Sequence, residues 1–153
     1  GLPTETVCIN DVIANELERV LPLAQGRPIA LQLDARCHLS LTAPEKVLSV
    51  LLGNLLRNAF KYAGRQIIVS AQLQDGKIVV HVDDDGIGIP PEDRENVFSA
   101  FTRLDRSRDR ATGGYGLGLA ITRRVLELHG GTATADASPL GGARFTLAWP
   151  LAQ

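Results

Sequence analysis

Apolar residues recur at helical spacing near the start of the chain, across residues 10–25. They fall three or four positions apart, which predicts an amphipathic helix that packs one face against a core. Asn10 is a suitable N-cap for this helix, and Gly26 follows at a position where helices commonly end. The apolar positions are Val12, Ile13, Leu17, Val20 and Leu21.

Leucines at the same spacing predict a second helix, which begins near residue 45. Thr42 and Glu45 form a capping-box pattern, and Pro44 is tolerated in a first helical turn. One broad face of this helix is apolar and is expected to be buried. Its members are Val47, Leu48, Leu51, Leu52, Leu55, Leu56 and Ala59.

Two asparagines, Asn54 and Asn58, stand one turn apart at the border of this apolar face, followed by Lys61 and Tyr62. Asparagine is a poor helix former because its side chain competes with the backbone for hydrogen bonds. Two asparagines on one face of a leucine-rich helix therefore indicate a polar binding site beside the core. The alternative is an ordinary solvated helix edge.

Short segments rich in isoleucine, valine and other strand-forming residues predict a β-sheet. Asp75-Gly76 is a strong signal for a hairpin turn, so the strands on either side of it are expected to pair antiparallel. A loop is expected through residue 41, and a second hairpin turn near residues 139–142. The predicted strands span residues 29–33, 66–74, 77–84, 131–137 and 142–149.

The third predicted strand runs into an acidic, glycine-rich segment, DDDGIGIP, at residues 83–90. Glycine lets a backbone approach a ligand closely, and a carboxylate accepts a hydrogen bond from an amino group. The segment is therefore a candidate binding loop, with a plain acidic turn as the alternative.

The periodic pattern stops between Phe98 and Gly113, which predicts a long mobile loop. It carries four arginines, whose guanidinium groups suit phosphate oxygens, although a solvated charge cluster is the alternative. Phe98 and Phe101 are expected to hold its start against the core. The arginines are Arg103, Arg106, Arg108 and Arg110.

The segment GYGLGL, residues 114–119, then opens a helix that is expected to reach about His129. A glycine-rich entry to a helix presents backbone N–H groups and the positive end of the helix dipole to an anion. The spacing matches neither a Rossmann fingerprint nor a P-loop, so another kind of anion site is indicated.

Composition is that of a globular domain and excludes several function classes. The 153 residues are 44% hydrophobic with a net charge of −1, which gives no electrostatic reason to bind nucleic acid or an anionic membrane. No apolar run approaches the roughly 20 residues of a membrane span, and the amino end lacks a signal-peptide pattern. Two cysteines are too few for a disulfide framework, and three histidines lack metal-ligand spacing, so structural roles are expected.

Four features, taken in chain order, resemble one known family. The asparagine-bearing helix, the DDGIGIP turn, the arginine loop and the GYGLGL entry are similar to the catalytic and ATP-binding domain of bacterial two-component sensor histidine kinases, in the GHKL ATPase superfamily. The closing GGARFTLAWP resembles the last strand of the family. The resemblance implies one domain over residues 1–153 with an α/β fold, the two-layer α/β sandwich called the Bergerat fold. Its mixed sheet of about five strands would be covered on one face by three helices, with a mobile ATP lid.

The resemblance also implies roles for single residues. Asn58 matches the asparagine that binds Mg²⁺, and Asn54 a position that helps to hold the metal or its waters. Asp84 matches the carboxylate that takes the adenine amino group, while Asp83 and Asp85 are expected to be solvated. Lys61 and Arg103 match phosphate-contacting cations that act in catalysis together with Asn58, and Tyr62 matches an aromatic at the adenine. The remaining expected ATP contacts are Gly86, Gly88, Arg108, Gly114, Gly116, Leu117 and Gly118.

The function implied by the resemblance is transfer of the γ-phosphate of Mg-ATP to a histidine. That histidine is expected on a separate upstream dimerisation domain, because none of the three here sits in the phosphoacceptor motif of the family. A response regulator is the expected downstream partner. The domain is expected in the cytoplasmic portion of an inner-membrane sensor kinase, with no nucleic acid partner and no membrane contact of its own.

Two other functions stay open on the sequence alone. One is an ATP-hydrolysing clamp, in which a glutamate usually stands four residues before the metal-binding asparagine. Here that position is Asn54, whose amide cannot act as a general base at neutral pH. The other is a noncatalytic nucleotide-binding interaction module, which the matches at Asn58 and Asp84 disfavour.

Overall fold

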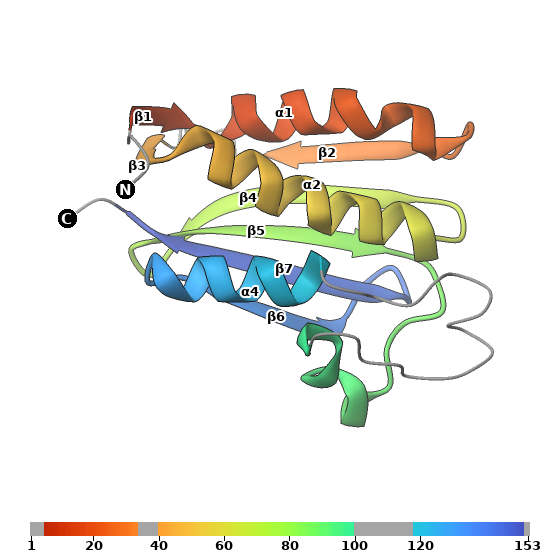
Figure 1. The fold of residues 1–153 in the computed structure, drawn as a ribbon. Helices are drawn as coiled ribbons and strands as arrows, with labels where there is room; N and C mark the ends of the chain where they lie inside the picture. Colours follow the sequence, from red (N-terminus) through yellow and green to blue (C-terminus); the bar gives the residue numbers. More distant parts are fainter. Residues whose placement is uncertain (1–4, 34–39, 100–117, 152–153) are drawn as a thin grey trace.

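The computed structural model describes residues 5–33, 40–99 and 118–151 (Figure 1). The helices are α1 (Ile9–Val20), η1 (Leu21–Ala24), α2 (Glu45–Tyr62), η2 (Pro91–Asp93), η3 (Asn96–Phe98) and α4 (Gly118–Leu128). The strands are β1 (Glu5–Cys8), β2 (Ile29–Leu33), β3 (Ser40–Ala43), β4 (Ile67–Gln74), β5 (Lys77–Asp84), β6 (Thr132–Ala137) and β7 (Ala143–Pro150). None of the helices among these residues is long and apolar enough to cross a membrane.

The main sheet has five strands in the order β2-β4-β5-β7-β6. The pair β2 and β4 is parallel and the other neighbouring pairs are antiparallel, so the sheet is mixed, as predicted. Its three central strands, β4, β5 and β7, carry the longest ladders. The end of β5 therefore lies inside the sheet, between strands on both sides.

Helices α1, α2 and α4 lie over one face of this sheet (Figure 1). The apolar stripe of α2 is buried as predicted, with Leu48, Leu51, Leu52, Leu55 and Leu56 each at most 1% exposed. They join one continuous core with the inward-facing residues of the sheet. Burial of such side chains is the main term that stabilises a two-layer fold. The predicted two-layer α/β sandwich is confirmed.

The hairpin between β4 and β5 follows from its turn residues. Asp75 and Gly76 both have positive φ, at 53° and 75°. A two-residue turn of type I′ requires this conformation at both positions, and Asp-Gly is among the sequences that tolerate it best. The turn fixes the register that places Asp84 at the end of β5.

Two predictions at the starts of helices were wrong. Helix α1 begins at Ile9, so Asn10 lies inside its first turn instead of capping it. Helix α2 has Pro44 as its N-cap, because Thr42 belongs to strand β3. Strands β1 and β3 pair antiparallel and were not predicted, since their partners lie more than thirty residues apart along the chain.

The end of the described segment 40–99 packs as expected. The ring of Phe98 meets that of Phe145 edge-on, with 6.2 Å between centroids, and both side chains are buried. Phe98 therefore holds η3 against the sheet. Phe101 lies outside the described residues.

Candidate functional site

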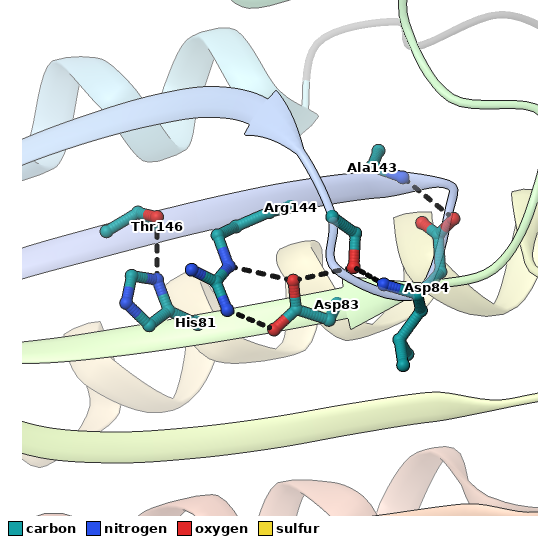
Figure 2. Close-up of polar contacts among 8 residues, drawn as sticks. His81, Asp83, Asp84, Ala143, Arg144 and Thr146 are labelled. Atoms are coloured by element: carbon teal, nitrogen blue, oxygen red, sulfur yellow. Dashed lines mark hydrogen bonds and ion pairs between the residues drawn. The ribbon is translucent and has the colours of Figure 1, made fainter.

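Asp84 is the buried carboxylate at the end of β5, with 1% of its surface exposed. Its Oδ1 accepts a hydrogen bond of 2.9 Å from the backbone N–H of Gly86 and one of 3.2 Å from the backbone N–H of Ala143, and Figure 2 shows the second. These two donors come from opposite sides of the carboxylate, one from its own loop and one from strand β7. The carboxylate is therefore fixed in orientation before any ligand arrives.

Gly86 brings the loop after β5 into contact with the end of α2. A Cβ atom at this position would overlap the carbonyl oxygen of Tyr62 and lie 2.8 Å from its carbonyl carbon. Gly88 has a φ of +72° and lies against the backbone of Gly142. Both predicted glycines thus sit where backbone meets backbone around Asp84.

Asn58 lies one turn before Tyr62 on the same helix. Its side chain is 9% exposed, and its Nδ2 is buried without a hydrogen-bond partner among the described residues. A buried amide that lacks a partner costs stability, so such a group in a native fold calls for an explanation. A polar ligand bound beside α2 would supply one.

Asn54 instead connects α2 to the start of α4. Its Nδ2 donates to the carbonyl oxygen of Gly118, at 3.3 Å, and to Oγ1 of Thr122, at 3.2 Å. Its Oδ1 accepts a hydrogen bond of 2.8 Å from the exposed side chain of Arg57. Asn54 and Gly118, both predicted site residues, are therefore in direct contact.

Lys61 and Tyr62 follow at the end of α2 with different environments. The ring of Tyr62 is buried in the core, with 7% of the residue exposed, while Lys61 is exposed. The ammonium group of Lys61 lies 5.8 Å from the centroid of the Tyr62 ring. The site thus has an exposed cation beside a buried aromatic.

Several predicted site residues cannot be placed. Arg103, Arg108, Gly114, Gly116 and Leu117 lie outside the described residues. The described segments before and after them, 40–99 and 118–151, are in contact through the side chain of Arg123. There the guanidinium of Arg123 lies 2.6 Å from Oε1 of Glu95 and 4.9 Å from the centroid of the Phe98 ring.

The expectation that Asp83 is solvated was wrong. Asp83 is 4% exposed, and its two oxygens accept hydrogen bonds from Nε and NH2 of Arg144, at 2.8 and 3.1 Å. Its Oδ1 also accepts from the hydroxyl of Ser138, at 2.9 Å (Figure 2). Asp83 and Arg144 are opposite each other in the β5–β7 register, so the pair could be recognised only once that register was known.

Asp85 also has a structural role that sequence reasoning missed. Its Oδ1 accepts hydrogen bonds from the backbone N–H groups of Gly64, Arg65 and Gln66, at 2.8 to 3.1 Å. Partial burial pushes the pKa of Asp85 upward, but these backbone hydrogen bonds outweigh it and lower the pKa below its usual value. Asp85 thus secures the loop after α2 to the end of β5.

His81 gives the sheet a predicted pH dependence. Its Nδ1 lies 2.8 Å from Oγ1 of Thr146, and burial, followed by the charge of Arg144, lowers the pKa of His81 despite the opposing pull of Asp83 and Asp136. A histidine with a lowered folded pKa takes up its proton more readily when unfolded, so stability falls as pH drops below about 6.5. We expect His81→Gln to reduce this loss between about pH 7.5 and 5.5 in thermal unfolding. Wild type and variant share all carboxylates, so equal pH slopes for both would contradict the assignment.

Within the described residues, no group of three His, Cys, Asp or Glu side chains could hold a metal ion. A hard cation such as Mg²⁺ binds through few protein oxygens when phosphate oxygens and waters complete its shell. The Oδ1 of Asn58 could serve as one such oxygen ligand, while its buried Nδ2, a donor without a partner among the described residues, suits an acceptor such as a phosphate or water oxygen.

The chain matches known proteins over most of its length. A family model described as histidine kinase-, DNA gyrase B-, and HSP90-like ATPase covers residues 43–153. Sensor protein RstB of Escherichia coli is 41% identical over 150 residues, which are 98% of this chain and 32% of RstB. The sensor-like histidine kinase SenX3 of Mycobacterium tuberculosis is 38% identical over 152 residues, 97% of this chain and 37% of SenX3. The chain therefore spans about a third of the length of these relatives.

Solved structures agree with the sequence matches. The mycobacterial sensor histidine kinase MprB superposes with a TM-score of 0.80 at 28% identity, over 96% of this chain and 97% of that one. Full-length ShkA in complex with AMPPNP superposes with a TM-score of 0.86 at 29% identity, over 100% of this chain and 32% of that one. The predicted resemblance is confirmed: the chain belongs to the family of histidine kinase-, DNA gyrase B- and HSP90-like ATPases.

Proposed function

We propose that this chain is the phosphoryl-donor domain of a sensor histidine kinase, which binds Mg-ATP and presents its γ-phosphate to a histidine on another domain. The observation that carries the proposal is the buried, pre-oriented carboxylate of Asp84 at the end of β5, where the following loop packs at Gly86 against the end of α2. The similarity to the sensor protein RstB and to the sensor-like histidine kinase SenX3 supports the same class of activity.

Adenine recognition is assigned to Asp84. A carboxylate whose Oδ1 is already held by two backbone N–H groups accepts an additional hydrogen bond without losing orientation. Gly86 keeps the loop backbone close to the end of α2, where Tyr62 borders the base. ShkA, to which this chain is structurally similar, was solved in complex with AMPPNP, and this supports a nucleotide ligand for the chain.

Mg²⁺ is assigned to Asn58, with Asn54 at its margin. Mg²⁺ bound between such a residue and the phosphates supplies charge neutralisation for phosphoryl transfer. Asn58 would hold the ion through Oδ1 while its buried Nδ2 donates to a phosphate or water oxygen, and Asn54 Oδ1, which already accepts from Arg57, has a second lone pair for a water. Lys61 is exposed beside them and suits a phosphate contact, as Arg103 and Arg108 do in the segment 100–117.

Transfer is favoured over hydrolysis by the chemistry of Asn54. A hydrolase needs a base near the phosphate to activate water, and the amide of Asn54 cannot accept that proton. Its Nδ2 also donates to Gly118 and Thr122, which makes it a connection between helices. The proposed nucleophile that attacks the γ-phosphate is therefore a histidine outside this chain, and not water.

The proposed partners follow from the need for an acceptor histidine outside this chain. The acceptor histidine belongs to an upstream dimerisation domain, and a response regulator receives the phosphoryl group afterwards. The parent protein is proposed to be an inner-membrane sensor with this domain on its cytoplasmic side. The glycine-rich entry to α4 completes the proposed phosphate contacts, with Gly114, Gly116, Leu117 and Gly118.

The test is a transfer assay with labelled ATP. We expect no stable label on this chain alone, and label on the histidine-bearing dimerisation domain of the parent protein when that domain is added. Asp84→Asn is expected to lower transfer at subsaturating ATP by about 10- to 100-fold, since a charge-assisted hydrogen bond to the base is weakened.

The outcomes separate the alternatives. Stable label on this chain in isolation would contradict the donor role. Steady phosphate release without transfer would favour an ATP-hydrolysing clamp. Binding of ATP with neither transfer nor release would favour a noncatalytic nucleotide-binding module.

A further inference from the structure

We propose that Asp83, Arg144 and Ser138 form a positioning network that holds Asp84 in place to select the amino group of adenine. The inference rests on the proposed function, because it assigns a specificity-determining role behind the proposed adenine contact. Asp83 and Asp84 are neighbours on β5, and side chains alternate between faces along a strand. Asp83 therefore lies on the opposite face of the sheet from Asp84 and acts through other residues.

The first step is the clamp on Asp83. Arg144 holds both carboxylate oxygens in a two-pronged contact, and the hydroxyl of Ser138 donates to Oδ1 from the other side (Figure 2). The hydrogen bond from Arg144 to Asp83 raises the pKa of the arginine further above its ordinary range. Two parallel hydrogen bonds between ionised groups fix geometry more strongly than one.

The second step is the turn that Ser138 closes between β6 and β7. The Oγ of Ser138 accepts from the backbone N–H of Leu140, at 3.0 Å. The backbone of Ser138 donates to the carbonyl of Gly142 and accepts from the N–H of Gly141, both at 2.9 Å. Ser138 is thus bonded at its hydroxyl, N–H and carbonyl, and the bond from its hydroxyl to Asp83 ties the conformation of the turn to β5.

The third step carries this geometry to Asp84. The N–H of Gly142 donates to the Asp84 carbonyl oxygen, at 3.1 Å, and the N–H of Ala143 donates to Asp84 Oδ1, at 3.2 Å. A Cβ atom on Gly142 would lie 2.5 Å from both the Asp84 carbonyl oxygen and the Gly86 nitrogen. Because Ala143 immediately precedes Arg144, a shift of the arginine backbone moves the donor that orients Asp84.

The network therefore predicts a loss of base discrimination when the clamp is broken. We compare binding of ATP with binding of purine riboside triphosphate, which lacks the 6-amino group, by calorimetry at fixed Mg²⁺. In wild type we expect a clear preference for ATP. In Asp83→Asn we expect the ATP affinity to fall about tenfold, as when a charge-assisted hydrogen bond is weakened, with less than about a twofold change for the analogue.

Asp136→Asn is the matched control. Asp136 is exposed on β6, opposite Arg144 in register, and it influences the arginine through charge without a role in the turn. The variant removes the same charge from the same neighbourhood and is expected to keep the full preference for ATP. Ser138→Ala removes only the hydroxyl that bonds Asp83 and Leu140, so it can be tested if Asp83→Asn does not fold.

The readout separates this inference from simple destabilisation. A variant that is only less stable would lose affinity for both triphosphates equally, and such a result in Asp83→Asn and Ser138→Ala would overturn the inference. Unchanged preference in both variants would overturn it as well, while leaving the proposed function intact. A wild-type chain that binds neither triphosphate, or binds both alike, would overturn the adenine role of Asp84 and this inference with it.

Discussion

Replacing Gly86 with alanine is expected to cost about 3 kcal/mol of stability and to lower ATP affinity at least about 100-fold. A methyl group here would overlap the carbonyl oxygen of Tyr62, and backbone at the end of α2 cannot rotate away as a flexible side chain can. Either the helix end or the loop after β5 must move. Both border Asp84, so the stability loss and the binding loss have one cause.

The measurement is thermal unfolding together with calorimetric ATP titration. A loss of about 3 kcal/mol corresponds to a fall of roughly 6 to 12 °C in melting temperature for a domain of this size. Gly76→Ala is the control, because Gly76 has a φ of +75° but nothing within 4 Å of an added Cβ. That variant is expected to lose about 1 to 2 kcal/mol from backbone strain alone and to bind ATP normally. ATP binding by Gly86→Ala at wild-type strength would contradict the contact.

Local signals in the sequence were sufficient for the elements whose partners are close along the chain. The Asp75-Gly76 turn demands positive φ at both residues, and it fixed the β4–β5 hairpin and the place of Asp84. The leucine stripe of α2 predicted the buried face of that helix because helical period and burial coincide. The strand β2 was also found from alternation alone.

Elements that depend on distant partners could not be found in the same way. Strand β3 exists because it pairs with β1, and that pairing removed Thr42 from the predicted helix cap. The residues around Thr42 do not reveal that this segment pairs with β1, because α1 and β2 lie between the two strands along the chain. Non-local pairing outweighed a local capping pattern here.

The candidate site was predicted unevenly for a related reason. Asn58, in a polar row on a leucine-rich helix, stood out from the pattern of its own element, while Asp84 was picked from the acidic, glycine-rich segment by the resemblance to the family. Asp83 accepts hydrogen bonds from Arg144, and Asp85 accepts them from backbone N–H groups after α2, and sequence spacing reveals neither set of partners. A polar residue that its own element does not explain therefore indicated the proposed site, while the residues that support Asp84 and its loop became visible only in three dimensions.

The two asparagines of α2 are expected to respond to alanine in opposite directions. Asn58→Ala removes a buried Nδ2 that has no partner among the described residues and adds helix propensity, so the nucleotide-free domain should gain about 1 kcal/mol. Asn54→Ala removes hydrogen bonds to Gly118 and Thr122 and from Arg57, so it should lose about 1 kcal/mol after the same gain in propensity. Denaturant unfolding without nucleotide measures both.

The expected effect of Asn58→Ala on phosphoryl transfer is opposite in sign to its expected effect on stability. With the proposed metal ligand removed, Asn58→Ala should transfer the γ-phosphate at least about 100-fold more slowly, although it is expected to be the more stable protein. A gain in stability with a loss in activity is the mark of a residue kept for its ligand and not for the fold. If Asn58→Ala instead destabilised the domain as much as Asn54→Ala, its amide would have a structural partner, and the assignment of Mg²⁺ to Asn58 would lose the physical argument that supports it.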